Sequence, residues 1–177
     1  MGKTTLCFEL AALLKKRDRS VEMVREVARF CPLPINRETT MAAQSWILHT
    51  EIAEELVATN KAEIVICDRS VLDNYCYLIS AGQAPMLEPL VRWWTSTYHL
   101  LIKVPIIETP MFDGTRDVDA AFQAAIDDKI DEVLERWGVP TLRLNHERRE
   151  HWAGDSLEVI LPLLGPVQQP LFNGEKI

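Results

Sequence analysis

The feature that most constrains the fold is Gly2-Lys3-Thr4-Thr5 at the start of an apolar helical pattern. Gly-Lys-Thr is the second half of the phosphate-binding loop G-x-x-x-x-G-K-[ST], whose following helix points its N-terminus at a phosphate. In this pattern Gly2 lets the backbone approach the phosphate, Lys3 supplies a cation, and Thr4 offers a hydroxyl to Mg²⁺. The first half of the loop is not part of the 177-residue sequence, so the motif needs support from the rest of the chain.

Composition excludes several classes of protein. A chain of 177 residues with 47% hydrophobic content is typical of one globular domain. The net charge of -7 and the isoelectric point near 5.1 argue against a nucleic-acid binder, which would present a basic face. We expect no membrane association, because no apolar run reaches about 18 residues. The four cysteines form no C-x-x-C pair, which indicates reduced thiols in a cytoplasmic protein.

Apolar periodicity predicts helices that alternate with strands. We expect helices over residues 4–16, 38–60, 71–80, 86–97, 119–137 and 156–164, and strands over residues 21–27, 64–67, 100–104 and 141–144. The continuous apolar run 64–67 is typical of a central strand buried on both faces. The alternation predicts an α/β fold, a parallel sheet with helices on both faces. One domain would cover residues 1–164, and a loosely ordered tail residues 165–177.

The helix expected over residues 38–60 carries glutamates beside its apolar stripe. The residues that mark the buried side at helical spacing are Met41, Leu48, Ile52 and Leu56. We expect the neighbouring acidic residues to face water, namely Glu51, Glu54 and Glu55.

Charged residues follow three of the predicted strands. They are Glu26 and Arg29 after the strand over residues 21–27, Asp68 and Arg69 after residues 64–67, and Arg116 in the loop after residues 100–104. In open parallel sheets, ligands bind at the carboxyl ends of the strands. We therefore expect these side chains to gather beside Lys3 and Thr4 around a phosphate.

Each of these residues also has a structural interpretation. Asp68 could cap the next helix while Arg69 is a surface cation, since Asp is a favoured N-cap. Glu26 and Arg29 could form a local salt bridge worth about 0.5 kcal/mol. Arg116 could be a solvated loop cation. A charged pair directly after a buried strand is costly unless it is used, which favours the functional interpretation of Asp68 and Arg69.

Five segments occur in an order and spacing that together are fairly specific. They are Gly2-Lys3-Thr4-Thr5, Arg25-Glu26-Val27-Ala28-Arg29, Gln44 in a long helix, the run from Ile64 to Asp73 with Tyr75 and Tyr77 beyond it, and Asp113-Gly114-Thr115-Arg116-Asp117. With these segments the chain resembles the P-loop ATPases of the ribosylnicotinamide-kinase type. This AAA-like family is related to the thymidylate and deoxynucleoside kinases. The resemblance extends to about His146.

The resemblance implies ATP and Mg²⁺ as cofactors and a role for each matching residue. The residues implied in cofactor binding are Gly2, Lys3, Thr4 and Thr5, and those implied in metal binding are Thr4 and Asp68. The phosphate acceptor would contact Glu26, Arg29 and Arg69. The residues implied in catalysis are Lys3, Asp68 and Arg116. Arg116 would belong to a lid over residues 105–117. Acceptor specificity would lie around Glu26, Gln44 and Tyr75, and we expect Asp73 to cap a helix or pair near Arg69.

The implied activity is transfer of the ATP γ-phosphate to a nucleoside or similar small metabolite. Two alternatives remain open at this point. The chain could be a nucleotide-binding regulatory ATPase or GTPase without a small-molecule acceptor. It could also be an interaction module, which would explain the tryptophans at positions 93 and 94.

The resemblance also implies a strand ahead of Gly2 in the middle of the sheet. That strand would lie between the strand that ends at Asp68 and the strand that ends at Val104. We therefore expect the fold of residues 1–177 to lack its first central strand, as in a truncated form. Low stability and weak ATP binding would follow, because the cradle of backbone N–H groups around the β-phosphate would be incomplete.

Overall fold

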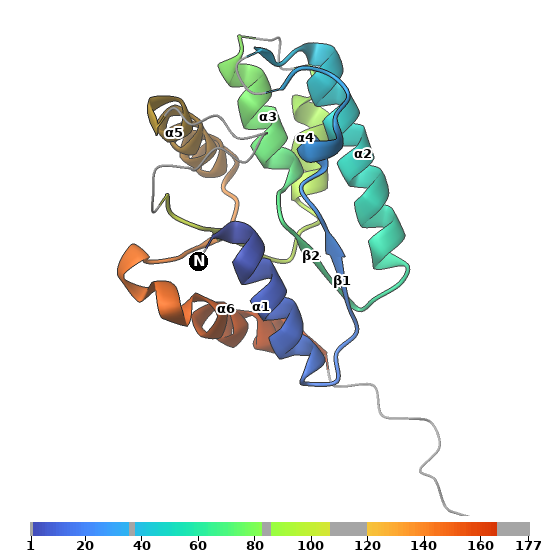
Figure 1. The fold of residues 1–177 in the computed structure, drawn as a ribbon, viewed down its shortest axis with the longest axis vertical. Helices are drawn as coiled ribbons and strands as arrows, with labels where there is room; N and C mark the ends of the chain where they lie inside the picture. The colour runs from blue at the N-terminus through green and yellow to red at the C-terminus, as the bar shows by residue number, and fades with distance from the viewer. Residues whose placement is uncertain (1, 36–37, 83–85, 107–119, 166–177) are drawn as a thin grey trace, which may run out of the picture.

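The computed structural model describes residues 2–35, 38–82, 86–106 and 120–165. Its elements, in chain order, are α1 (Lys3–Lys15), β1 (Val21–Val24), η1 (Val27–Phe30), α2 (Met41–Thr59), β2 (Ile64–Cys67), α3 (Val71–Ser80), α4 (Glu88–Thr95), β3 (Leu101–Lys103), α5 (Ala120–Trp137), β4 (Thr141–Arg143), η3 (His146–His151), α6 (Trp152–Ile160) and η4 (Leu161–Leu163). Short strands alternate with helices, as the sequence predicts, and the protein is of the α/β class (Figure 1).

The strands are parallel, but they do not form one continuous sheet. β1 pairs with β2 in the register Val21 to Ile64, and β3 pairs with β4 in the register Leu101 to Thr141. The described residues therefore contain two separate two-stranded sheets, and the break falls between the two strands that the resemblance separates by a further strand. In the part of the chain that the structure describes, no backbone ladder joins β2 to β3.

Helices cover both faces of the strand pairs, as the predicted architecture requires. On one face α1 and α6 lie side by side, and their cluster includes Leu14 and Trp152 as well as side chains from all four strands (Figure 1). On the other face α2, α3, α4 and α5 form a second cluster around Val71, Cys76 and Val133. Each helix layer packs against strands of both pairs, so the two small sheets lie between the same two layers of helices.

The last helix begins earlier than expected. The prediction placed its start at residue 156, whereas α6 begins at Trp152. The Trp152 side chain is fully buried, and its indole Nε1 donates a hydrogen bond of 2.7 Å to the carbonyl oxygen of Asn145. The aromatic ring thus anchors the first turn of α6 in the core, a tertiary effect that local periodicity does not show.

The prediction that the glutamates of α2 face water is wrong for two of the three. Glu54 is exposed, but Glu51 and Glu55 are only 2% and 5% exposed, while Leu56 is 51% exposed. The reason is hydrogen bonding: Asn74 donates to Glu51, and Trp94 Nε1 donates to Glu55 at 2.6 Å. Buried carboxyl groups with such donors are tolerated, so the buried face of α2 is rotated toward the glutamates.

The predicted tail and lid fall largely outside the described residues. The tail was expected over residues 165–177, and the structure describes only Gly165 of it. Residues 107–119, which hold most of the expected lid and Arg116, are also outside the described ranges.

Candidate phosphate-binding site

The first turn of α1 meets the carboxyl end of β2. Thr4 Oγ1 donates a hydrogen bond of 2.6 Å to Asp68 Oδ2. Lys3 is the first helical residue and is exposed, and Gly2 precedes it as an N-cap without a side chain. The first turn holds no acidic residue, so the N-terminal N–H groups and Lys3 present positive charge beside the Asp68 carboxyl group.

Asp68 is a buried carboxyl group in a site of mixed charge. It is 9% exposed, and burial raises its pKa above the ordinary value. The nearby Glu26 raises the pKa further, whereas the Thr4 hydrogen bond and the charges of Arg69 and Lys3 lower it. A buried carboxylate with a raised pKa beside a hydroxyl donor is suited to accept a proton or to hold a hard cation.

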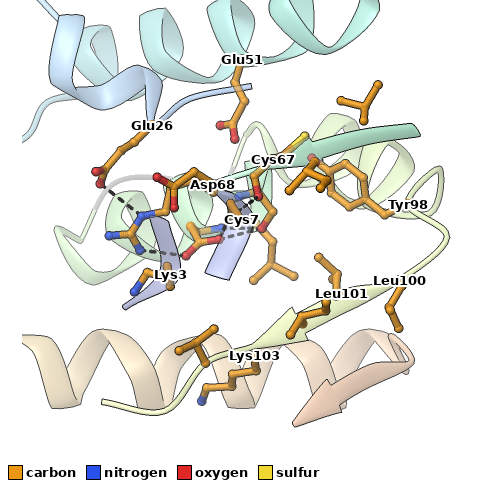
Figure 2. Close-up of a pocket in the computed structure, with 18 of the residues that line it drawn as sticks. Lys3, Cys7, Glu26, Glu51, Cys67, Asp68, Tyr98, Leu100, Leu101 and Lys103 are labelled. Atoms are coloured by element: carbon orange, nitrogen blue, oxygen red, sulfur yellow. Dashed lines mark hydrogen bonds and ion pairs between the residues drawn. The ribbon is translucent and has the colours of Figure 1, made fainter. Parts of the chain in front are cut away.

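Glu26 links the end of β1 to the end of β2. Its carboxylate accepts from Arg29 Nε at 2.8 Å and from Arg69 Nε at 3.2 Å. Arg69 Nη1 also donates to Asp73 Oδ1 at 3.1 Å, and the Arg69 side chain is 19% exposed. In Figure 2, Glu26, Asp68 and Lys3 lie on the same side of the view, with Lys3 below the two carboxyl groups. The predicted charged residues of these two strand ends therefore form one cluster.

The pKa shifts of this cluster follow from its geometry. Burial acts to raise the pKa of Glu26, but the guanidinium groups of Arg69 and Arg29 outweigh it, and the pKa lies below the ordinary value. Burial likewise acts to raise the pKa of Asp73, and Arg69 together with the Ser70 hydrogen bonds lowers it overall. Both carboxylates are thus held in the charged form by partners in the cluster.

The cap of α3 rules out a helix-capping role for Asp68. The N-cap is Ser70, and it forms a capping box with Asp73: the Ser70 N–H donates to Asp73 Oδ2 at 3.0 Å, and Asp73 N–H donates to Ser70 Oγ at 3.4 Å. Asp68 is therefore not a helix cap, and the largely buried Arg69 is not a surface cation. The expected structural role of Asp73, capping and pairing with Arg69, is confirmed.

A polar floor made by α2 and α3 lies next to this cluster, and the sequence analysis missed most of it. Asn74 donates to Glu51, and both side chains are buried. Gln44 Nε2 donates to Thr39 Oγ1 at 2.7 Å, while Gln44 Oε1 is buried without a hydrogen-bond partner. The stripe of Gln44, Leu48, Glu51 and Glu55 at helical spacing is the signal that could have identified this floor.

Tyr75 does not belong to the floor, although the sequence analysis named it with Glu26 and Gln44 for acceptor specificity. Its hydroxyl group donates to Glu88 of α4, and its ring stacks on Trp137 with the ring centroids 5.5 Å apart. Tyr77, two positions further on, lines the cavity that contains Glu26, Asp68 and Arg69. The side chain from this part of α3 that faces the site is therefore Tyr77.

The structure thus brings together most of the predicted site residues. Lys3, Thr4 and Asp68 lie at the junction of α1 and β2, and Glu26, Arg29 and Arg69 lie beside them. Gly2 lines the same cavity, and Thr5 is exposed on the first turn of α1. Arg116 lies outside the described residues, so its predicted role stays a prediction.

The donors present fit a nucleotide phosphate and Mg²⁺. A lysine and a helix N-terminus without acidic residues suit a phosphate, and the hydroxyl of Thr4 with the carboxylate of Asp68 gives two hard oxygen ligands for Mg²⁺. The described residues hold no group of three or more His, Cys, Asp or Glu side chains that could bind a metal on their own. This donor set matches Mg²⁺ bound partly through phosphate oxygens, the usual arrangement in nucleotide sites.

These observations define an α/β domain in which a helix N-terminus suited to a phosphate meets a buried carboxyl group. The family model described as AAA domain matches residues 1–151, and the chain belongs to this family of P-loop NTPases. Family membership indicates that the protein binds a nucleotide. A comparison with curated proteins found no match. Among the described residues, no helix is both long and apolar enough to cross a membrane.

Proposed function

We propose that the protein is an ATP-dependent phosphotransferase that moves the γ-phosphate to a nucleoside or similar small metabolite. The observation that carries this proposal is the contact of Thr4 with the buried Asp68, beside a second cluster formed by Glu26 and Arg69. An enzyme that only hydrolyses the nucleotide needs the Thr4 and Asp68 contact but not the cluster of Glu26 and Arg69. A transferase also needs a place for an acceptor, and the second cluster lines the same cavity as Lys3 and Asp68.

The roles follow from charge and position. Lys3 and the N-terminus of α1 bind the phosphates and offset the negative charge that develops during phosphoryl transfer. Thr4 and Asp68 would hold Mg²⁺, which would neutralise phosphate charge when bound. In the alternative role, Asp68 would not bind the metal and would accept the proton of the acceptor hydroxyl, which its raised pKa supports.

The acceptor lies against Glu26, Arg69 and the floor of α2. Glu26 and Arg69 offer a carboxylate and a guanidinium that bind hydroxyl groups, and both are preorganised by their mutual hydrogen bond. Gln44 Oε1, buried and without a partner, offers an acceptor for a donor group of the substrate. Four free cysteines support a reducing compartment, and we place the enzyme in the cytoplasm.

The test is a phosphoryl-transfer screen with γ-labelled ATP and Mg²⁺ over nucleosides, nucleotides and ribosylnicotinamide. We expect transfer to at least one acceptor, and we expect Asp68→Asn to lower the rate at least about 100-fold while ATP binding persists. The exposed Asp128→Asn on α5 is the matched control and should leave the rate unchanged.

Two outcomes would replace this proposal. Binding of ATP without transfer to any acceptor in the panel would favour a nucleotide-binding regulator. Absence of any nucleotide binding would favour an interaction module, for which the exposed Trp93 on α4 offers an apolar contact.

A further inference from the structure

Glu51 is a buried carboxyl group that faces the cavity of the phosphate site. Its side chain is 2% exposed, and it lines the same cavity as Lys3, Glu26 and Asp68. Figure 2 shows the side chain extending from α2 into this cavity, above Asp68. Glu51 therefore belongs to the wall that a phosphate acceptor would contact.

Glu51 has fewer partners than a buried carboxylate requires. Within the described residues its hydrogen-bond partner is Asn74, whose amide donates to Oε2. The other oxygen, Oε1, takes part in no hydrogen bond or ion pair of these residues. A buried carboxylate is costly unless donors or a cation offset the loss of water. The site therefore offers Glu51 too little to hold a negative charge on its own.

The nearest cation is already engaged. Burial, together with the charges of Glu55 and Asp73, raises the pKa of Glu51 well above its ordinary value, and Arg69 only partly offsets this. The guanidinium group of Arg69 binds two other carboxylates: Nε donates to Glu26 at 3.2 Å and Nη1 to Asp73 at 3.1 Å. Arg69 is thus not available as the ion-pair partner of Glu51.

Glu55, one turn further along α2, shows the contrast. Both of its oxygens accept hydrogen bonds, one from Trp94 Nε1 at 2.6 Å and the other from the Tyr98 hydroxyl group at 2.9 Å. Glu55 is therefore satisfied as a structural group. Glu51 has one donor and one oxygen left for a ligand.

Gln44 gives an independent sign that donor groups of a ligand belong here. It lies two turns before Glu51 on the same face of α2, about 10 Å along the helix axis, and lines the same cavity. Gln44 is 4% exposed, and its Nε2 donates to Thr39 Oγ1 at 2.7 Å, while its Oε1 is buried without a partner. A buried acceptor without a donor is costly, so both open oxygens are complementary to N–H or O–H groups of one molecule.

We propose that Glu51 binds a primary ammonium group of the phosphate acceptor, so that the acceptor is a small hydroxyl compound that also carries an amine. An ammonium group is compact, supplies the missing positive charge and carries three donors. Gln44 Oε1 accepts a second N–H or O–H group of the same molecule. The inference rests on the proposed function for the role of this ligand as acceptor, and its test measures binding without ATP.

Binding of the ammonium group releases one proton. Glu51 gives its proton to the solvent and remains as a carboxylate beside the ammonium group, which keeps all its hydrogens. Because a ligand that binds the ionised form lowers the pKa of Glu51, the affinity rises with pH above 4.5 and levels off above the folded-state pKa. The titratable and charged groups that face Glu51 are Glu55 on α2, Asp73 on α3, Arg69 before α3, Cys67 at the end of β2 and Tyr98 before β3.

The test is a calorimetric titration with linear amino alcohols from propanolamine to hexanolamine, each compared with the diol of equal length. These amines stay charged up to about pH 10, as a lysine side chain does. We expect the best amine to bind at least about tenfold more tightly than its diol near pH 7, with an affinity that rises from about pH 5. Heats in two buffers of different ionisation enthalpy should show release of a proton. An amine that binds no more tightly than its diol, including no binding of either, would overturn the proposal.

Glu51→Gln keeps an acceptor for Asn74 but cannot ionise, so the preference for the amine and its pH dependence should both disappear. Glu54→Gln, exposed on the same helix, is the matched control and should keep both. A preference for the amine that survives in Glu51→Gln would assign it to another group and overturn the proposal. If Glu51→Gln does not fold, the pH series and the proton release of the wild type decide the question.

Failure of this inference can be distinguished from failure of the proposed function. Phosphoryl transfer to neutral acceptors alone, at rates that Glu51→Gln leaves unchanged, would overturn the ammonium site and leave the phosphotransferase standing. Binding of an amine that depends on Glu51, without transfer to any amine or other acceptor, would support the ammonium site and overturn the phosphotransferase.

Discussion

Thr4 Oγ1 donates a hydrogen bond of 2.6 Å to Asp68 Oδ2, and this contact joins the start of α1 to the end of β2 across 64 positions of the sequence. It places a hydroxyl group and a carboxyl group where the N-terminus of a helix and Lys3 supply positive charge. The contact is the geometric basis for assigning a phosphate and Mg²⁺ site to this junction.

The first prediction concerns the stability that this contact provides. Thr4→Val keeps the shape of the side chain but removes the donor, and it leaves the buried Asp68 carboxyl group without that bond. We expect a loss of about 1–2 kcal/mol in the free energy of unfolding, measured by urea denaturation. Thr5→Val, on the exposed side of the same turn, is the control and should cost much less. Equal losses would mean that the contact contributes nothing specific.

The second prediction concerns Arg69, which bridges Glu26 and Asp73. Arg69→Met removes the cation and leaves two largely buried carboxylates, so we expect a loss of about 3 kcal/mol at pH 7. Both carboxyl pKa values lie below their ordinary values of 4.5 and 3.8. Their contribution is therefore complete above pH 4.5 and is lost as the pH falls below 3.8 through the lowered pKa values.

The measurement is a series of urea denaturation curves from pH 7 to pH 3 for the wild type and Arg69→Met. The difference in unfolding free energy should shrink as the pH falls. A difference that does not change with pH would show that Arg69 acts through packing and not through its charge.

The third prediction concerns Glu51, whose pKa is shifted in the opposite direction to the pKa values of Glu26 and Asp73. Burial, together with the charges of Glu55 and Asp73, raises the pKa of Glu51 well above its ordinary value of 4.5. A carboxyl group with a raised pKa favours the folded state at low pH, and this contribution is lost as the pH rises from 4.5 through the folded-state pKa. Glu51→Gln keeps an acceptor for Asn74 and does not ionise.

We therefore expect Glu51→Gln to be more stable than the wild type at pH 8, by at least about 1 kcal/mol, with the advantage disappearing toward pH 4. Thermal unfolding across this range measures the effect. Glu54→Gln is the matched control, since Glu54 is exposed on the same helix. A destabilised Glu51→Gln protein at pH 8 would mean that the charged carboxylate is required by the fold.

The sequence predicts the elements of this fold better than their assembly. The apolar run 64–67 and the periodic helices reflect local patterns, and each appears in the structure within a few residues. The meeting of Lys3 and Thr4 with Asp68 could also be predicted, because the carboxyl ends of parallel strands share one edge of a sheet. The inference that charged residues meet at one edge of the sheet needs only the direction of the strands and not their order.

Other features depend on partners that are distant in the sequence. Glu51 is buried because Asn74 on α3 supplies a donor, and a helical pattern within α2 alone favours exposure of its glutamates. Arg69 pairs with Glu26 across 43 positions as well as with the adjacent Asp73, so its burial could not be read from its own segment. The resemblance placed a strand between residues 64–67 and 100–104, and these two strands are not paired with each other in the described residues.

The most direct test of the account is a calorimetric titration of the protein with ATP in the presence and absence of Mg²⁺, comparing Lys3→Ala with Lys15→Ala. The two lysines lie at opposite ends of α1 and both are exposed, so the pair separates the proposed phosphate-binding end from the rest of the helix. We predict Mg²⁺-dependent binding by the wild type and by Lys15→Ala, and at least about tenfold weaker binding by Lys3→Ala. Equal ATP affinity of the two variants, or no binding by the wild type at any ATP concentration, would contradict the assignment of a nucleotide site to Lys3, Thr4 and Asp68.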